Sequence, residues 1–180
     1  MIKSLKKEVG VLMDILGLDR NDPNLQDTPR RISKMLVNEM FFGLYHPAPK
    51  CTVFPNTEKY NEMVKTTFSE WSTCSHHFVP FECQVKIAYI PNKKVIGLSK
   101  IPRVFKWYSR RPQLQENLTK QVADHLQDVL GTKDVAVHIR GRHLCAVMRG
   151  IEKSDIWFTT TDLRGKFRRG AVRQEFFQGD

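Results

Sequence analysis

Apolar residues recur at every third or fourth position near the start of the chain, and this spacing predicts two helices. The apolar positions of the first helix are Leu5, Val9, Leu12 and Leu16. After the interruption "GLDRNDPN", the segment "DTPRRISKMLVNEMFFG" has Thr28 as a cap and Pro29 in the first turn of a second helix. Its expected buried stripe is Ile32, Met35, Leu36 and Met40, and Gly43 suits its end.

The hydrophobic period falls to two between about residues 66 and 98, which predicts strands. In "ECQVKIAYIP", Cys83, Val85, Ile87 and Tyr89 alternate with more polar neighbours. "PNKK" is typical of a turn and "VIGL" of a short returning strand. We therefore expect a hairpin here.

The helical period then returns. A short helix is expected over about residues 101–109, and the strongest helical pattern follows, with apolar residues at Leu114, Leu118, Val122, Leu126 and Val129 before Gly131. "DVAVHIRG" and "RHLCAVMRG" alternate again and predict a second pair of strands, and the basic tail "LRGKFRRGAVRQEF" is expected on the surface. This order predicts an α+β fold with an antiparallel sheet.

Length and composition fit a single domain over residues 1–180. A chain of this length buries about 70% of its unfolded surface without covalent cross-links. It has no apolar run long enough for a bilayer and no apolar signal segment at its start, so we expect a cytoplasmic protein without a membrane partner. The four cysteines are irregularly spaced, which favours metal ligands or nucleophiles over disulfides. The net charge of +10 suits a polyanion such as nucleic acid, anionic lipid or nucleotide phosphates.

A dense group of potential metal ligands lies in "WSTCSHHFVPF", residues 71–81. Adjacent side chains in an extended segment point in opposite directions, so His76 and His77 are not expected to share one ion. Cys74 and His77 form a C-x-x-H pair that a tight turn can close on one metal, which leaves His76 free for another role. The competing interpretation is a buried structural cysteine beside incidental histidines.

A third ligand is expected from "RHLCAVM", where His143 and Cys145 are two residues apart on a predicted strand and so face the same side. A Cys-His-Cys set leaves the fourth zinc position for water, as in catalytic sites. Zinc lowers the pKa of that water from about 15.7 towards about 7. His76 and His143 would be nearby imidazoles suited to proton transfer.

Several polar residues could bind a phosphorylated substrate. The phosphate candidates are Ser99, Lys100 and Arg103 in "GLSKIPR", Arg149 after the second cysteine motif, and Arg31 and Lys34 on the second helix. The first three lie at a predicted helix start, where phosphate binds well, whereas surface charge explains the last two equally well. Gln115 and Glu116 open the strongest helix, and a carboxylate there could accept hydrogen bonds from a guanine edge.

Five motifs in sequence, "DTPRRISKM", "CSHHFVPF", "GLSKIPR", "RRPQLQENLT" and "HLCAVMRG", together resemble the GTP cyclohydrolase I family from about residue 27 to residue 161. The resemblance implies the tunnelling fold: an antiparallel sheet with paired helices over residues 50–180, preceded by a helical segment over residues 1–45. It implies a homodecamer of two pentameric rings with active sites between subunits. The reaction would convert GTP and water to formate and 7,8-dihydroneopterin triphosphate, for folate, reduced pterin or deazaguanine synthesis.

The resemblance also implies roles for residues of this chain. One Zn²⁺ per subunit would be held by Cys74, His77 and Cys145, and water activated by it would attack C8 of the purine. His143 would protonate the imidazole ring, and His76 would assist ring opening. Gln115 and Glu116 would hold guanine, and the triphosphate would be bound by Ser99, Lys100, Arg103, Arg149, Arg31 and Lys34. The chain departs from the family pattern at Ser75, Arg140, Gly141 and residues 156–158.

Two other functions compete with this one. A nitrile reductase of the same fold would need a nucleophilic cysteine with a nearby acid and no zinc, whereas two cysteines and a histidine here match a zinc set. A zinc-stabilised nucleic-acid-binding protein would fit the charge. However, the chain lacks interleaved aromatic and basic residues of the RNA-binding kind and a four-ligand zinc knuckle, which argues against nucleic acid as a partner.

Overall fold

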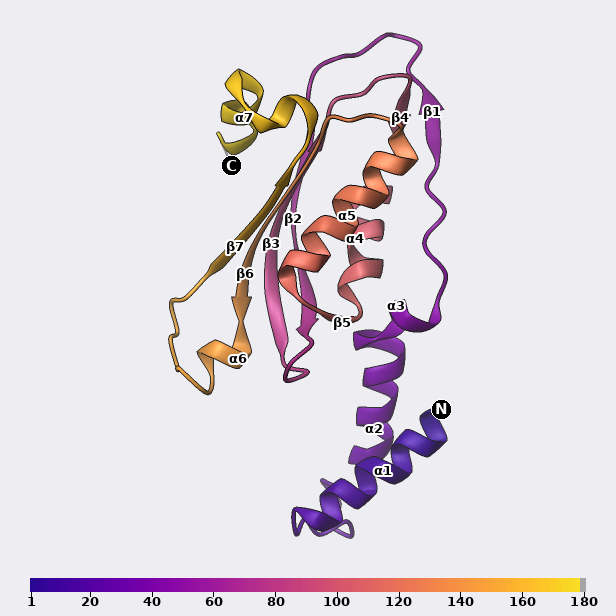
Figure 1. The fold of residues 1–180 in the computed structure, drawn as a ribbon. Coiled ribbons are helices and arrows are strands. Elements are labelled where there is room, and N and C mark those ends of the chain that lie inside the picture. The colour runs from indigo at the N-terminus through magenta and orange to yellow at the C-terminus, as the bar shows by residue number, and fades with distance from the viewer. Residues whose placement is uncertain (179–180) are drawn as a thin grey trace.

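The centre of the structure is a five-stranded sheet with the strand order β5–β2–β3–β6–β7 (Figure 1). The strands are β2 (Val64–Cys74), β3 (Pro80–Tyr89), β5 (Pro112–Gln113), β6 (Val135–His143) and β7 (Phe158–Leu163). The four long strands are antiparallel to their neighbours, and β5 adds two residues parallel to β2. This is a computed structural model that describes residues 1–178. The α+β class with an antiparallel sheet is therefore confirmed.

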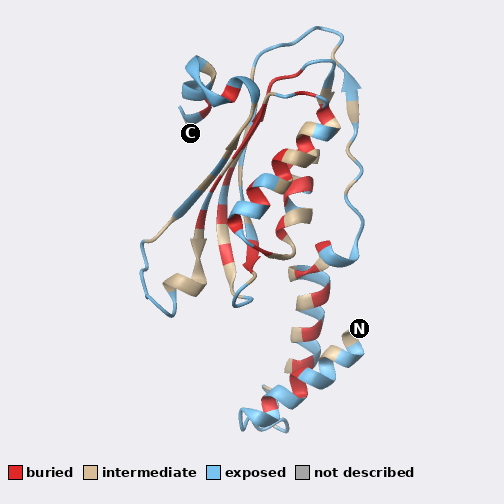
Figure 2. Cartoon of the chain, in the orientation of Figure 1, coloured by how far each residue is buried: buried red, intermediate tan, exposed pale blue. Residues whose placement is uncertain are grey.

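Two helices, α4 (Lys100–Ser109) and α5 (Gln115–Leu130), lie together on one face of the sheet (Figure 1). The alternation along β3 turns Cys83, Val85 and Ile87 towards these helices, where all three are buried. Most of the buried residues of the chain lie between this sheet face and the helix pair (Figure 2). Gly131 ends α5 with φ = 63°, the left-handed conformation that suits glycine after a helix, as the sequence predicts.

The expected hairpin between "ECQVKIAYIP" and "VIGL" is wrong. Strand β3 pairs with β2 on one side and β6 on the other, while β4 (Lys94–Ile96) pairs with β1 (Val53–Pro55) in a separate two-stranded sheet. The eleven residues of β2 can pair with the backbone of β3 along all ten of its residues, whereas the three residues of β4 cannot. The preferred partner is therefore the preceding long strand.

The second expected strand pair also differs. The segment "DVAVHIRGRH" is one continuous strand, β6, because Gly141 stays in register with Cys83 on one neighbour and Phe158 on the other. The residues that follow form the helical turn α6 (Leu144–Val147). Cys145 therefore lies on a helical turn and not on a strand, and the true partner of β6 is β7.

An N-terminal helical arm extends away from the sheet (Figure 1). It consists of α1 (Ile2–Ile15), α2 (Thr28–Met35), the π-helical turn η1 (Leu36–Met40) and α3 (Phe42–Tyr45). Of the stripe predicted to be buried, Ile32, Leu36 and Met40 are half-buried and Met35 is exposed. The fully buried positions of α2 and η1 are Pro29, Ser33 and Val37. Because the arm contacts little of the sheet, much of its apolar surface remains uncovered (Figure 2).

Gly43 does not end the helix as expected but lies inside α3. Its amide donates a hydrogen bond to the carbonyl oxygen of Arg110 at 3.0 Å. A Cβ atom there would lie 2.9 Å from that same oxygen, so the arm reaches the end of α4 only because this position has no side chain. None of the helices within residues 1–178 combines the length and the hydrophobicity of a transmembrane segment.

The basic tail is only partly a surface segment. It forms the end of β7, the 3₁₀ turn η2 (Gly165–Arg168) and α7 (Gly170–Phe177). Its charged side chains are mostly exposed, but Phe167 and Phe176 are fully buried against Ala88 and Ala136. These two aromatic rings attach the tail to the sheet face that α4 and α5 leave uncovered, and the charge count of the segment does not reveal them.

Candidate metal centre and active site

The first potential ligands lie where β2 ends and the chain turns back into β3. Cys74 is the last residue of β2, and His76 and His77 lie in the turn that follows. Two backbone hydrogen bonds close this turn: the amide of Phe78 donates to Cys74 at 2.9 Å, and the amide of Cys74 donates to Val79 at 2.9 Å. The turn is tight enough to bring the C-x-x-H pair together, as its spacing predicts.

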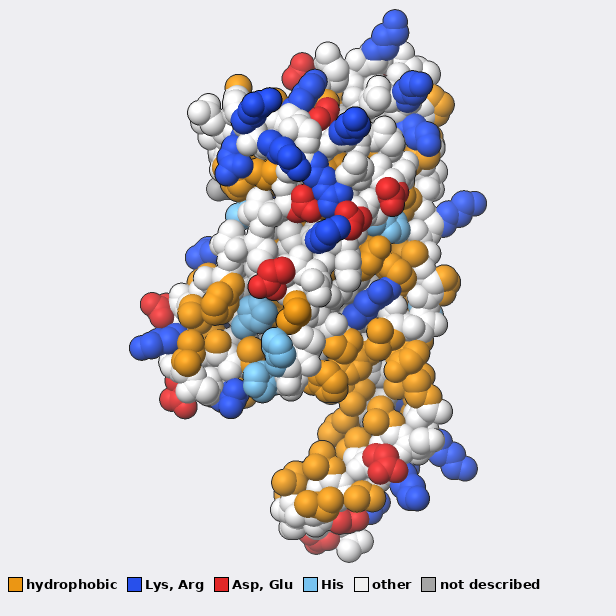
Figure 3. All heavy atoms as spheres, viewed as in Figure 1, with side chains coloured by type: hydrophobic (Ala, Val, Ile, Leu, Met, Phe, Trp, Pro, Cys, Tyr) orange, Lys and Arg blue, Asp and Glu red, His pale blue; other side chains and the backbone are white. Residues whose placement is uncertain are grey.

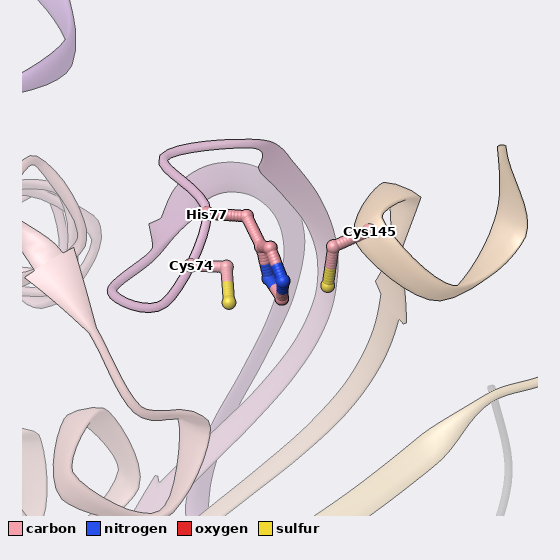
Figure 4. A group of neighbouring side chains, drawn as sticks. All are labelled: Cys74, His77 and Cys145. Atoms are coloured by element: carbon pink, nitrogen blue, oxygen red, sulfur yellow. The ribbon is translucent and has the colours of Figure 1, made fainter. Parts of the chain in front are cut away.

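Cys145 completes the group from α6. The ligand atoms of Cys74, His77 and Cys145 all lie within 4.8 Å of one another. Figure 4 shows the side chains of Cys74 and His77, from one turn, and of Cys145, from a separate helical turn, directed into one common space. The structure groups the three residues that the sequence predicts as ligands, but Cys145 reaches the group from a helical turn and not from a strand.

The chemistry of these donors suits a soft divalent metal. Two thiols and one imidazole are the ligand types that zinc prefers, and three protein ligands leave a fourth position open. Burial and the neighbouring Cys74 raise the pKa of Cys145, so a cation between the two sulfurs would favour their charged forms. Nη1 of Arg149 lies 3.3 Å from Nε2 of His77, which places this cationic side chain at the edge of the site.

A cavity of about 380 Å³ opens beside the three donors. It is lined by Cys74, His76, His77, Gln113, Leu114, Gln115, Glu116, His143, Cys145, Ala146, Phe158 and Thr160. Figure 3 shows histidine side chains gathered on this face among hydrophobic ones. Apolar walls with a few convergent polar groups are typical of a small-molecule site.

His143 is held from three sides. Its ring stacks on Phe81 at a centroid distance of 4.2 Å, meets the edge of Phe158 at 5.6 Å, and bonds through Nε2 to Oε1 of Gln115 at 2.9 Å. Burial lowers its pKa, and the nearby carboxylate of Glu116 acts in the opposite direction. Sequence reasoning missed Phe81 and Phe158 as part of this site, because their contacts with His143 cross strands.

Glu116 lies in the first turn of α5, exposed at the mouth of the cavity. Its carboxylate makes none of the hydrogen bonds or ion pairs described for residues 1–178. It is therefore free to accept hydrogen bonds from a ligand. The side chain of Gln115, by contrast, is buried and bonded within the protein.

Most of the expected phosphate-binding residues do not meet this cavity within one chain. Ser99, Lys100 and Arg103 lie at the start of α4, whereas the end of α4 is the part nearest the cavity (Figure 1). Arg31 and Lys34 lie on the arm, where Nε of Arg31 is 3.3 Å from a carboxylate oxygen of Asp27. Of the six residues, Arg149 alone is in described contact with the group of potential metal ligands.

The remaining two cysteines lie outside this group. Cys83 is fully buried in the core. This burial is the main cause that raises the pKa of its thiol, and the negative charges of Glu70 and Glu82 raise it further. Cys51 is half-buried, with its sulfur 3.7 Å from Nε2 of His125. Neither belongs to the group of potential ligands found among residues 1–178.

We therefore expect Cys51→Ala and Cys83→Ala to leave the metal content of the purified protein unchanged. The physical reason is distance, since neither thiol can reach the ion that the other two cysteines would share. Elemental analysis of each folded variant beside the wild type gives the test. Loss of metal from either variant, with native circular dichroism, would show that the ligand set is wrong.

The fold and the site together define a class: an α+β protein with a twisted antiparallel sheet, two helices on one face, and an open Cys-His-Cys group at a cavity between strand ends. The comparison with known families makes the class specific. Residues 5–179 match the family model described as GTP cyclohydrolase I. The chain belongs to the GTP cyclohydrolase I family, and its fold is the tunnelling fold of that family.

Two relatives found by sequence agree with this assignment. The chain is 46% identical to the GTP cyclohydrolase 1 of Aeromonas salmonicida over 180 residues, covering 98% of this chain and 83% of the relative. It is 42% identical to that of Flavobacterium johnsoniae, covering 97% and 79% of the two chains. Among solved structures, the archaeosine synthase QueF-Like in the apo form aligns at a TM-score of 0.47 and 15% identity, covering 57% of this chain and 93% of that one.

Proposed function

We propose that this chain hydrolyses GTP at C8 of the purine and releases formate and 7,8-dihydroneopterin triphosphate, with one water consumed overall. The observation that carries the proposal is the convergence of Cys74, His77 and Cys145 beside a cavity that also presents His143 and Glu116. Membership of the GTP cyclohydrolase I family supports it over nearly the full length of the chain.

The metal would be one Zn²⁺ per chain, held by Cys74, His77 and Cys145. The two sulfurs and one imidazole nitrogen within 4.8 Å of one another support this choice. When bound, zinc would supply Lewis acidity and water of lowered pKa at the open coordination position. The protein contributes a rigid donor set, since Cys74 is fixed by the closed turn and Cys145 by α6.

The proton transfers would be carried out by the two histidines that are not ligands. His143 would deliver a proton to the imidazole portion of the purine, and its position between Phe81 and Phe158 restricts the plane of its ring. His76 is an exposed residue of the cavity lining, with its Nδ1 3.9 Å from Sγ of Cys74, and would act near the ribose during ring opening. Positioned imidazoles are efficient at neutral pH because their pKa lies close to it.

Guanine would be selected by Glu116. A carboxylate can accept from both N1–H and the exocyclic amine of guanine, and adenine does not offer this arrangement. A site that depends on such hydrogen bonds rejects a ligand without them by about 10⁴-fold or more. The exposed, uncommitted carboxylate of Glu116 at the cavity mouth supports this role.

Glu116→Ala is accordingly expected to lower GTP turnover by roughly 10²–10⁴-fold, because two hydrogen bonds to a charged acceptor are lost at about 1.5–3 kcal/mol each. Zinc content should not change. Asp128→Ala, which removes an exposed carboxylate from the other end of the same helix, is the matched control and should retain activity. If Glu116 only stabilised the start of α5 through the helix dipole, its loss would cost about 0.3–1 kcal/mol of stability and leave turnover near wild type.

The triphosphate would be bound at an interface between copies of the chain. Its charge requires several cations, and arginine binds phosphate in bidentate fashion. Because the start of α4 and the arm lie away from the cavity of the same chain, Ser99, Lys100, Arg103, Arg31 and Lys34 would reach the substrate only from other parts of an assembly. Arg149 would contribute from the same chain as the metal ligands.

A ring-based homodecamer would provide such interfaces. The exposed apolar residues of the arm support assembly, since an uncovered hydrophobic surface of this kind is typical of subunit contacts. They include Val11, Leu12, Ile15, Leu16, Leu18 and Met35. They account for the hydrophobic cluster at the lower end of the molecule in Figure 3.

The proposed reaction is tested by incubating the zinc-loaded protein with GTP. Formate and 7,8-dihydroneopterin triphosphate should appear in equal amounts, the latter detected by its fluorescence after an added chemical oxidant converts it to the neopterin form, and ATP should give neither. Steep salt-dependent binding to random DNA without GTP turnover would instead favour a nucleic-acid-binding protein.

A further inference from the structure

The side chain of Gln115 has only one orientation that satisfies its surroundings. It is 3% exposed, and its Nε2 lies 3.2 Å from the carbonyl oxygen of Ile139 and 3.1 Å from that of Phe158. The hydroxyl of Thr160 lies 3.0 Å from the same nitrogen. Two backbone carbonyls can only accept hydrogen bonds, so the NH₂ group must face them. The amide oxygen of Gln115 therefore points the other way.

That oxygen faces His143. The distance from Oε1 of Gln115 to Nε2 of His143 is 2.9 Å. An amide oxygen only accepts, so Nε2 of His143 carries a hydrogen whether the imidazole is neutral or charged. Nδ1 is the ring nitrogen that this contact leaves available to a substrate. The partner of one ring nitrogen thus decides which nitrogen does the chemistry.

Gly141 makes room for this arrangement. It lies within β6 between Cys83 and Phe158, and its backbone conformation is open to any residue. A Cβ atom built on it would lie 2.9 Å from Cδ of Gln115 and would overlap Oε1. Glycine is therefore needed at position 141 because a larger residue would collide with the Gln115 side chain. The backbone conformation of the strand does not itself require glycine there.

We propose that Gln115 is a positioning residue that fixes the orientation and tautomer of His143, and that Gly141 provides the space it occupies. This rests on the proposed function and deepens it, by assigning the amide of Gln115 to the proton-transferring imidazole. A direct contact between that amide and guanine, which the family resemblance implies, would require it to give up its bonds to Ile139, Phe158 and His143.

The spatial part of the proposal is tested by thermal unfolding of the metal-free protein in a double-mutant cycle. Gly141→Ala should lower the melting temperature in the wild type, because the new methyl group displaces Gln115. In the Gln115→Ala background the same substitution should cost little, because the space is free. Equal losses in both backgrounds would overturn the proposal. This measurement does not depend on any activity, so it remains decisive even if the protein does not hydrolyse GTP.

The chemical part is tested by kinetics and binding with zinc-loaded protein. Gln115→Ala should lower kcat by about 10²-fold, the loss that a misplacement of about 1 Å can cause in a reacting group, with zinc content and GTP affinity retained. Gln127→Ala, on the same helix but bonded to Arg164, is the matched control and should behave as wild type. Weakened GTP binding with unchanged kcat would assign Gln115 to guanine and overturn the proposal. If Gln115→Ala does not fold, Gln115→Met preserves most of the volume without the hydrogen bonds and carries the same kinetic test.

Discussion

Cys145→Ser is expected to yield a folded protein without bound metal and without GTP turnover. A serine hydroxyl is not deprotonated at neutral pH and is a poor zinc ligand, and the two ligands that remain are too few for a stable site. The Lewis acid that would be lost contributes several kcal/mol to transition-state stabilisation. We therefore expect turnover to fall by roughly 10³-fold or more, since each factor of ten corresponds to about 1.4 kcal/mol.

The experiment requires metal analysis and kinetics on the same preparation, with Cys51→Ala as the matched thiol control. Cys51 is half-buried like Cys145 but contacts His125 rather than the three grouped donors. A Cys145→Ser protein that retains one zinc per chain would show that this thiol is not a ligand.

His143→Ala is expected to abolish most product formation while GTP still binds. A positioned proton donor typically contributes about 10²–10⁴-fold to the rate, and that contribution appears in kcat because it stabilises the transition state rather than the bound substrate. Zinc should also stay bound, since His143 is not among the three grouped donors.

His138→Ala provides the comparison for this substitution. It removes an imidazole from the same strand, whose Nδ1 lies 2.9 Å from the hydroxyl of Thr161. Its activity should remain close to wild type. A raised KM with unchanged kcat in His143→Ala would mean that His143 binds substrate instead of transferring a proton.

The features that could be predicted from the sequence are mostly local. The apolar period of α5 and the glycine that ends it depend on neighbours within one helix. The C-x-x-H spacing of Cys74 and His77 requires only one turn of chain, and the turn forms as expected. Ligand types and helix boundaries of this kind follow from residue chemistry and short-range geometry.

What could not be predicted depends on contacts between distant segments. The choice of β2 as partner for β3 is a competition between strand lengths, which alternation within "ECQVKIAYIP" does not reveal. The bond between Gln115 and His143 joins residues 28 positions apart and requires the missing side chain at Gly141. The predicted burial of Met35 is wrong, because burial on α2 depends on what covers the arm and one chain does not cover it.

The central claim, that one metal in the Cys74, His77 and Cys145 site is required for GTP hydrolysis, is tested most directly by titration. The protein is stripped of metal with a chelator, zinc is added back in measured steps, and formate release from GTP is followed at each step. Formate release should be absent at the start, rise in proportion to added zinc, and reach a plateau at one zinc per chain. Full activity in the metal-free protein, or no formate at any zinc concentration, would contradict the account.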